Sequence, residues 1–561
     1  MRAGLRVKAG LRVKAGLRVK AGAWARARRP ARSARSPRSL VALCLAWLLL
    51  GTAVTACSTG GPEPVTLRVL ASSELADMEP LLDDLRRETG IRLEMEYRGT
   101  VDASDALASG EYRHDLAWLS SDRYFQLKRK AARDQDEQPL ATAVMRSPVV
   151  IGMKSATAER LRRTASGGQI SWADVADAAA DGTLRFGMAD PRHANSGLAA
   201  LVGVATAAAD TGGVLRPQDV SCDRLRGFFA GHRLAEDSSA RLADGFVRDQ
   251  DHLEALITYE SELLTLNSGG KLREPLEIVH PKDGMVLSDY PLLLLDPAER
   301  AAYDRLVEWL KSGPVQKKIM ERTLRRPIDP EVARIPPLRE PIGNALYFPD
   351  DQRVVDRLLA DYGDPRRDGR ARVIFLLDFS GSMRGERIAR LRAAFDGLSG
   401  GDDSRSGKFV RFYRGESLTV MRFAGRVLDE RSVTYGSPRD LDRLRGFVAA
   451  DGFGPTTAVW SALDHAYEKV SDEIREQPGR TVSIVVMTDG ENNAGIDLGT
   501  FIRRYEARPA AVRAVRTYTV RYGEAGTAAL DRAARTTGGR MADATVQSLL
   551  SAFKEIRGCD Q

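Results

Sequence analysis

Hydrophobic and polar residues alternate with two different periods along residues 66–345. Apolar residues form a short run at 67–70, recur at helical spacing at 75–85, and alternate with polar residues at 91–97. A strand, a helix and a second strand in this order predict a parallel α/β sheet with right-handed crossovers. The pattern continues with further elements expected at 149–151, 184–188, 195–209 (a helix), 253–259, 276–279 and 285–295.

The periodicity fades near Pro336 and resumes in a second region of the chain. A short helical stretch at 354–359 is followed by 364–370, where Pro, Gly and dense charge indicate a domain boundary. The runs Val373–Leu377 and Val482–Met487 are continuously apolar, which is typical of central parallel strands buried on both faces. We therefore expect a second, doubly wound α/β domain from residue 371 onward.

The N-terminal residues have the composition of an export signal. Three copies of Ala-Gly-Leu-Arg-Val-Lys, which we treat as low-complexity sequence, precede an arginine-rich stretch and the apolar run Leu40–Leu50. That run is too short to span a bilayer comfortably. The segment Val54-Thr55-Ala56-Cys57 resembles the bacterial lipobox, which implies a lipid anchor on Cys57 at the extracellular face of the membrane. An ordinary secretory cut, with Cys57 as a stray thiol, is the alternative.

Charge and cysteine content narrow the range of partners. The chain has a net charge of +8, but residues 1–56 hold 13 Lys and Arg and no Asp or Glu, so the remainder carries −5. This balance argues against a nucleic-acid partner. Outside the leader and Cys57, only Cys222 and Cys559 remain, which excludes a disulfide framework. We expect two unpaired, partly buried thiols; a single extracellular disulfide is the alternative.

Oxygen-bearing side chains follow the two buried strands of the second domain. Asp378, Ser380 and Ser382 come after the first, and Asp489 comes after the other. Between them, Thr456-Thr457 precedes an apolar helix pattern. Carboxylates and hydroxyls are hard ligands that suit Mg²⁺ or Mn²⁺ better than Zn²⁺. The alternative is that Asp378 and the serines merely cap the helix that follows them.

The order Asp378-x-Ser380-x-Ser382, a threonine, then Thr488-Asp489-Gly490 resembles a von Willebrand factor type A (VWA) domain with its metal-ion-dependent adhesion site, over about 371–552. The resemblance implies that the serines and Thr457 bind Mg²⁺ (or Mn²⁺) directly, and the aspartates directly or through water. Thr456 is the alternative threonine. The mostly neutral ligands imply that a protein partner supplies an acidic residue. No nucleophile and base accompany the site, so we expect no enzymatic activity; a hydrolase using the ion as Lewis acid is a minor alternative.

Residues 66–345 resemble a two-lobed (type II) bacterial extracellular solute-binding protein. The resemblance rests on layout and on phrases such as Ser147-Pro148-Val149-Val150-Ile151 and Asp289-Tyr290-Pro291. It implies lobe one at 66–146 and 262–345, with lobe two between. Hydroxyls and helix N-termini in the cleft would favour an anionic ligand, although each residue has a helix-cap or turn role as its alternative. The candidates are Ser72, Ser73, Ser120, Ser121, Asn195, Ser196, Gly197, Tyr259 and Asp289.

These expectations combine into one organisation of the chain. A signal segment (1–56) and a lipidated tether (57–65) precede the solute-binding-like domain (66–345), a linker (346–370) and the VWA domain (371–561). The leading hypothesis is a non-enzymatic, membrane-anchored extracellular lipoprotein that binds a protein partner through its metal, coupled to a domain that resembles a binder of small solutes. A solute receptor of an ABC importer, with an accessory VWA domain, is the alternative.

Overall fold

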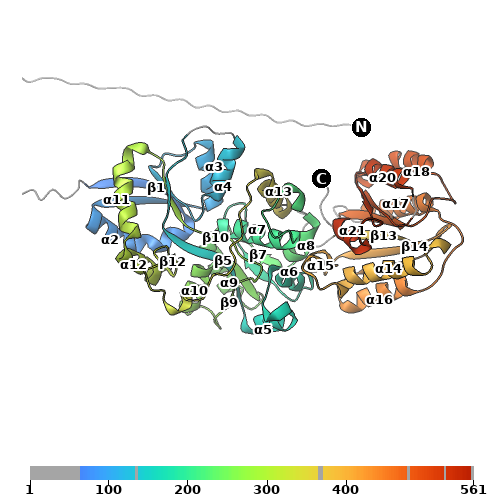
Figure 1. The fold of residues 1–561 in the computed structure, drawn as a ribbon, viewed down its shortest axis with the longest axis horizontal. Coiled ribbons are helices and arrows are strands. Elements are labelled where there is room, and N and C mark those ends of the chain that lie inside the picture. Colours follow the sequence, from blue (N-terminus) through green and yellow to red (C-terminus); the bar gives the residue numbers. More distant parts are fainter. Residues whose placement is uncertain are drawn as a thin grey trace, which may run out of the picture. The chain divides into compact units, whose positions relative to one another are not determined.

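The computed structural model describes residues 64–132, 137–220, 222–363, 371–476, 481–523 and 526–556, and the structural statements below refer to them. Three sheets organise these residues, two up to residue 327 and one after residue 371 (Figure 1). The expected leader, Cys57, residues 364–370 and Cys559 lie outside the described residues, and the side chain of Cys222 is not described. Within the described ranges, no helix has both the length and the apolar character needed to cross a membrane.

The first sheet has the strand order β2-β1-β3-β11-β4. Strand β1 runs parallel to β2 and β3, whereas β11 is antiparallel to β3 and β4. Helices α2, α11 and α12 contribute to the apolar core on one face and α3 and α4 to a second core. The elements are β1 (Val65–Ser72), α2 (Glu79–Thr89), β2 (Ile91–Arg98), α3 (Thr100–Ser109), β3 (Leu116–Trp118), α4 (Arg123–Ala132), β4 (Ala141–Ala143), β11 (Pro291–Leu294), α11 (Arg300–Lys311) and α12 (Gly313–Thr323).

The expected helix at 75–85 is present but begins in a different form. A 3₁₀ turn, η1 (Ser73–Met78), precedes α2. Pro80 lies at the start of α2, where a missing backbone N–H costs no intrahelical hydrogen bond. The apolar positions of the expected helix, Leu75, Leu81 and Leu85 among them, are buried as the periodicity predicts.

The second sheet is mixed, with the order β10-β5-β8-β6-β7 and with β9 and β12 paired to β5. Strand β5 is antiparallel to β8 and β9, whereas β6 is parallel to β7 and β8. The elements are β5 (Met145–Met153), α5 (Ser155–Thr164), α6 (Trp172–Ala180), β6 (Phe186–Met188), α7 (Asn195–Ala209), α8 (Cys222–Phe229), β7 (His232–Leu234), α9 (Ser239–Arg248), β8 (Ala255–Tyr259), α10 (Glu260–Ser268), β9 (Glu277–Val279), β10 (Leu287–Ser288) and β12 (Arg326–Pro327).

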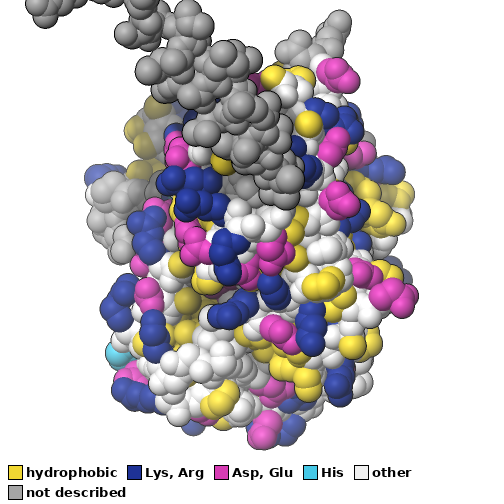
Figure 2. All heavy atoms as spheres, turned by 90° about the vertical axis from the view of Figure 1, so that its left-hand side faces the viewer, with side chains coloured by type: hydrophobic (Ala, Val, Ile, Leu, Met, Phe, Trp, Pro, Cys, Tyr) yellow, Lys and Arg dark blue, Asp and Glu magenta, His cyan; other side chains and the backbone are white. Residues whose placement is uncertain are grey.

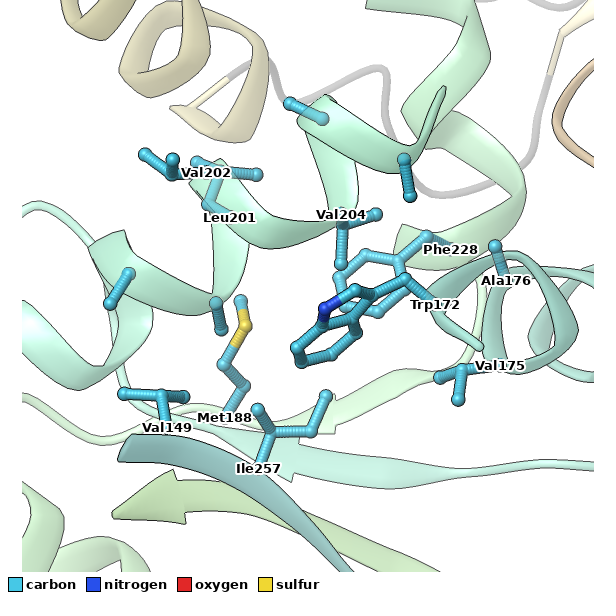
Figure 3. Close-up of a cluster of buried hydrophobic side chains, with 14 of the residues drawn as sticks. Val149, Trp172, Val175, Ala176, Met188, Leu201, Val202, Val204, Phe228 and Ile257 are labelled. Carbon is cyan, nitrogen blue, oxygen red and sulfur yellow. The ribbon is translucent and has the colours of Figure 1, made fainter. Parts of the chain in front are cut away.

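The core of the second lobe forms around Trp172 (Figure 3). Its indole lies among apolar side chains of α7, α8 and the sheet, and its Nε1 donates a hydrogen bond to the carbonyl of Gly284 at 2.9 Å. Helix α7, which has the expected bounds 195–209, is buried along most of its length. Its many alanines allow the close packing of a helix surrounded by protein.

Two expectations about the lobes are wrong. The chain first leaves the first sheet between β4 and β5, near the expected position, but it returns between β10 and β11 rather than near residue 262. Helix α10 and strand β9 therefore belong to lobe two. The apolar run expected as one element at 285–295 bends at Tyr290, whose φ of +46° separates β10 from β11. Neither sheet is purely parallel, because β11 is antiparallel to its neighbours in the first sheet and β5 is antiparallel to β8 and β9 in the second.

The segment expected as a linker is partly core. Helix α13 (Gln352–Gly363) contains the predicted helical stretch, and it buries Val354, Val355 and Leu358 against lobe two. Tyr362 packs edge-on against Phe229 of α8, with ring centroids 5.9 Å apart. The first region of the chain therefore continues past residue 345 and includes α13.

The third sheet has the order β15-β14-β13-β16-β17-β18, with every pair parallel except β14 and β15. Separate apolar cores form with α14, α16 and α21 and with α17, α18 and α20, which is the expected doubly wound arrangement. The elements are β13 (Arg372–Asp378), α14 (Glu386–Asp396), α15 (Arg405–Val410), β14 (Ser417–Phe423), β15 (Val427–Thr434), α16 (Pro438–Ala449), α17 (Val459–Glu476), β16 (Val482–Thr488), α18 (Leu498–Glu506), α19 (Ala510–Arg513), β17 (Arg516–Arg521), α20 (Thr527–Thr536), β18 (Met541–Asp543) and α21 (Leu549–Ile556).

Helix α15 of the third-sheet region contacts the second lobe. Phe409 belongs to the same apolar core as Trp172, and Lys408 forms an ion pair with Asp174 of α6 at 2.5 Å. Both side chains of this pair are largely buried. Residues 62–561 accordingly form one compact unit by their contacts.

The end of the molecule made by the first lobe has a mixed surface. Figure 2 shows Lys and Arg side chains interspersed with Asp and Glu on this face, together with scattered apolar groups. Interspersed charges of both signs are typical of an ordinary solvated surface.

Candidate functional site

The polar loops after β13 and β16 meet at one edge of the third sheet. The two strands are parallel neighbours, with Leu377 opposite Met487, so Asp378 and Asp489 leave the sheet at the same end. A backbone bridge between Ser380 and Gly454 brings in the loop that carries Thr457. In doubly wound sheets, ligands bind at this carboxyl end of the strands.

Asp378 is fully buried and held by two hydrogen bonds. Its Oδ1 accepts from the backbone N–H of Ser380 at 2.7 Å, and its Oδ2 accepts from the hydroxyl of Thr488 at 2.6 Å. Burial raises the pKa of Asp378 to about 6, and the two hydrogen bonds offset part of that effect. The carboxylate is thus fixed in one orientation.

A chain of hydroxyls connects this loop to Asp489. The hydroxyls of Ser380 and Ser382 lie 2.9 Å apart, and Ser382 Oγ donates to Asp489 Oδ1 at 2.8 Å. The other carboxylate oxygen, Oδ2, accepts from Nη1 of Arg387 at 2.5 Å. The side chain of Asp489 is buried, so both of its oxygens are engaged inside the protein.

The geometry favours Thr457 over Thr456 as the threonine of the site. Thr457 is buried, and its backbone N–H donates to Asn493 Oδ1 at 2.8 Å. A Cβ placed on Gly490 would lie 3.7 Å from Thr457 Oγ1 and 3.8 Å from Ser382 Oγ, so these two hydroxyls converge on one glycine. Thr456 Oγ1 lies instead beside Gly425, where a Cβ would come within 2.3 Å of it.

The helix-capping alternative does not describe these residues. Helix α14 begins after Gly385, and no side chain caps its N-terminus. Ser380 precedes the short 3₁₀ turn η7 (Gly381–Met383) without a side-chain capping bond. The hydroxyls bond to one another and to Asp489 instead of to helix amides.

The residues present fit a hard divalent ion. Among the described residues, no group of three or more His, Cys, Asp and Glu side chains could hold a metal ion. The predicted donors are two carboxylates and three hydroxyls. Oxygen donors of this kind suit Mg²⁺ or Mn²⁺. Too few are available to fill an octahedron, which leaves room for water or an outside ligand.

Sequence reasoning missed three contributors to this region. Thr488 holds Asp378, Asn493 holds the backbone of Thr457, and Arg387 contacts Asp489. The position of Thr488 in the Thr-Asp-Gly motif was a usable signal. Nothing in the sequence indicates where the tip of a long Arg387 side chain lies.

A second group of hydroxyls lies at strand and helix ends of the first lobe. Ser72 ends β1, Thr100 begins α3 and Ser120 follows β3, and all three are buried. The hydroxyls of Ser72 and Thr100 are 2.5 Å apart, and those of Thr100 and Ser120 are 2.7 Å apart. The backbone N–H of Ser120 also donates to Ser72 Oγ at 2.8 Å.

This group bonds across to the second lobe. The hydroxyl of Tyr259, the last residue of β8, donates to Ser120 Oγ at 3.0 Å. Asn195 Nδ2, at the start of α7, lies 3.0 Å from both the Tyr259 hydroxyl and Ser288 Oγ. Burial raises the pKa of Tyr259 well above its ordinary value, so its hydroxyl stays protonated. We call these six residues, including Thr100 and Ser288, the interlobe network.

The structure brings together Ser72, Ser120, Asn195 and Tyr259 of the nine cleft candidates, and the other three serines have local partners. Ser73 bonds to Glu74, Ser121 accepts from the N–H of Arg123, and Ser196 bonds to Ser239 within lobe two. Gly197 lets the backbone of Ala189 approach, because a Cβ would lie 2.0 Å from that carbonyl oxygen. Asp289 is half-buried, burial raises its pKa, and its Oδ1 has no hydrogen-bond partner among the described residues. Sequence reasoning missed Thr100 and Ser288.

Comparisons with known proteins cover both halves of the chain. The model of the bacterial extracellular solute-binding protein family matches residues 67–322, and that of the von Willebrand factor type A domain matches residues 373–556. A curated relative, inter-alpha-trypsin inhibitor heavy chain H3 of Mesocricetus auratus, is 29% identical over 127 residues. The match covers 22% of this chain and only 13% of that protein.

Solved structures similar to this chain include periplasmic binding proteins. AfuA from Actinobacillus pleuropneumoniae is 14% identical, covers 53% of this chain and 98% of its own, and gives a TM-score of 0.39. A periplasmic thiamin binding protein is 11% identical, covers 55% of this chain and 98% of its own, and gives a TM-score of 0.42. From the two family matches, the chain joins a domain of the bacterial extracellular solute-binding protein family to a C-terminal VWA domain.

Proposed function

We propose that this protein is a non-enzymatic, extracytoplasmic binding protein whose VWA domain holds a partner through a divalent ion. The observation that carries the proposal is the convergence of Asp378, Ser380, Ser382, Thr457 and Asp489 at one sheet edge. Mg²⁺ or Mn²⁺ would bind there. When bound, the ion would supply an electron-poor coordination position that attracts a carboxylate from a protein partner.

Among the described residues, no histidine lies in either site to act as a base for a hydroxyl nucleophile, which supports a binding role. All six histidines of the chain are described, and none is part of the metal site or of the interlobe network. The closest approach to catalytic chemistry is a hydrolase using the ion alone as a Lewis acid, and no observation favours it.

The interlobe network supports binding of a small anionic solute between the lobes. Its members carry hydroxyls and an amide, and none carries a negative charge. Asn195 is also the first residue of α7, and the backbone N–H groups at a helix N-terminus favour an anion. A solute receptor for an ABC importer, with the VWA domain as an accessory, is the alternative function that this network fits.

Location at the extracellular face of the membrane, through a lipid on Cys57, is part of the proposal. Two acyl chains hold a protein stably, whereas one holds it only reversibly. Cys57→Ser should therefore release the protein into the medium or leave the precursor uncut, as read by fractionation and mass. A variant that stays membrane-bound at wild-type length would show that another anchor acts.

The metal site is tested by thermal unfolding of the full mature chain. Mn²⁺ or Mg²⁺ at 100 times its dissociation constant should stabilise the wild type by about 2.7 kcal/mol, and Ca²⁺ should do so poorly. Asp378→Ala should remove this stabilisation. Asp472→Ala, which changes an exposed carboxylate of α17, is the matched control and should keep it. Equal stabilisation of the wild type and Asp378→Ala would refute the site.

A further inference from the structure

Arg387 occupies a specific position beside the proposed metal ligands. It lies in the first turn of α14, and its Nη1 is 2.5 Å from Asp489 Oδ2. The Asp489 side chain is 0% exposed and that of Arg387 is 36% exposed. The partly exposed side chain of Arg387 therefore contacts the Asp489 carboxylate, which has no access to solvent.

The surroundings are shaped to admit the guanidinium. Gly523 has a φ of +84°, and a Cβ on it would lie 3.4 Å from Arg387 Cζ and 3.2 Å from Asp489 Cβ. A side chain at position 523 would crowd both members of the ion pair, so the glycine leaves room for them. The glycine at position 523 thus supports the placement of the Arg387 guanidinium beside Asp489, in addition to the ion-pair distance.

The charges around the two aspartates explain why a cation is needed. Asp378 and Asp489 are both buried, and the hydrogen bonds to Asp378 come from the neutral Ser380 N–H and Thr488 hydroxyl. Of these two carboxylates, Asp489 forms an ion pair with Arg387. An uncompensated buried carboxylate is strongly destabilising, so the guanidinium stabilises the ion-free protein.

We propose that Arg387 is a built-in counter-ion that competes with the divalent ion for Asp489. This inference rests on the proposed metal site and adds a regulatory residue to it. A divalent ion near Asp489 repels the guanidinium, and both compete for the same carboxylate charge. Arg387 therefore lowers the ion affinity and sets the ion concentration at which the site fills.

The test measures Mn²⁺ affinity of the full mature chain by calorimetry, together with the unfolding temperature without ion. Arg387→Gln should bind Mn²⁺ at least fivefold more tightly than the wild type and should unfold at a lower temperature without ion. Arg387→Met keeps the aliphatic part of the side chain and should show the same two changes. It replaces Arg387→Gln in the test if that variant does not fold. A purely structural arginine would lower stability without raising ion affinity.

The control lies one turn further along the same helix. Arg390 is exposed and pairs with Glu386, so Arg390→Gln should leave the Mn²⁺ affinity unchanged. An Arg387→Gln variant with equal or weaker Mn²⁺ affinity than the wild type would overturn the inference while leaving the metal site intact. If neither the wild type nor the variants bind Mn²⁺, the metal site itself is refuted, and the inference falls with it.

Discussion

The chain holds two clusters of hydroxyl side chains, and they differ in charge. In the VWA domain, Ser380 and Ser382 lie beside the carboxylates of Asp378 and Asp489. In the interlobe network, serine and threonine hydroxyls bond to a tyrosine and an asparagine. Both lie at ends of parallel strands, where α/β folds place their ligands. We therefore propose a cation for the first cluster, which contains carboxylates, and an anion for the second, whose members are neutral.

The clusters also differ in how they are held together. The strand register of one sheet places Asp378 and Asp489, because β13 and β16 are hydrogen-bonded neighbours. The interlobe network joins two sheets, with Ser120 on one side and Tyr259 on the other. The first cluster is preorganised by a single domain, whereas the second depends on the approach of two lobes.

The largest expected effect is on the binding of a protein partner at the proposed metal site. EDTA should abolish recovery of extracellular-facing membrane proteins in a pull-down, and Mg²⁺ or Mn²⁺ should restore it, because the partner's carboxylate needs the ion. Asp489→Ala should have the same effect as EDTA. Recovery that is unchanged by both treatments would make the metal structural and would remove the functional contrast between the two clusters.

A smaller effect distinguishes the two neighbouring threonines. Thr457→Ala should lower the Mn²⁺ affinity about tenfold, equal to about 1.4 kcal/mol, because a ligating hydroxyl is lost. Thr456→Ala should leave the affinity unchanged, since its hydroxyl lies beside Gly425. Calorimetric titration of both variants gives the measurement. The reverse result would mean that the loop is shifted by one residue in solution.

The smallest effect concerns the interlobe network. Tyr259→Phe removes a hydroxyl shared by Ser120 and Asn195 and should lower the free energy of unfolding by about 1–2 kcal/mol in urea. It should also weaken any thermal stabilisation by sulfate or phosphate. Tyr303→Phe is the matched control, because that hydroxyl bonds to Thr142 within lobe one. Loss of anion stabilisation in the control as well would contradict a role specific to the lobe interface.

The local sequence pattern was sufficient to predict the position and burial of individual helices and strands. The helix at 195–209 has the expected bounds, and the apolar runs at 373–377 and 482–487 are buried central strands. The lobe boundary near 262 and the single element at 285–295 were wrong, because a bend at Tyr290 sends β10 and β11 to different sheets. A positive φ at a tyrosine has no signal in hydrophobic periodicity.

By itself, the sequence determined the two α/β domains, the order of the oxygen-bearing residues and the strand ends from which they project. Apolar periodicity and a motif with fixed spacing are local properties, so they can be read along the chain. Only the tertiary structure decided that the Thr457 and Ser382 hydroxyls lie near Gly490, that Arg387 reaches Asp489 and that Ser120 bonds to Thr100 and Tyr259. These contacts join side chains from separate elements, and their directions depend on packing and register that no single segment encodes.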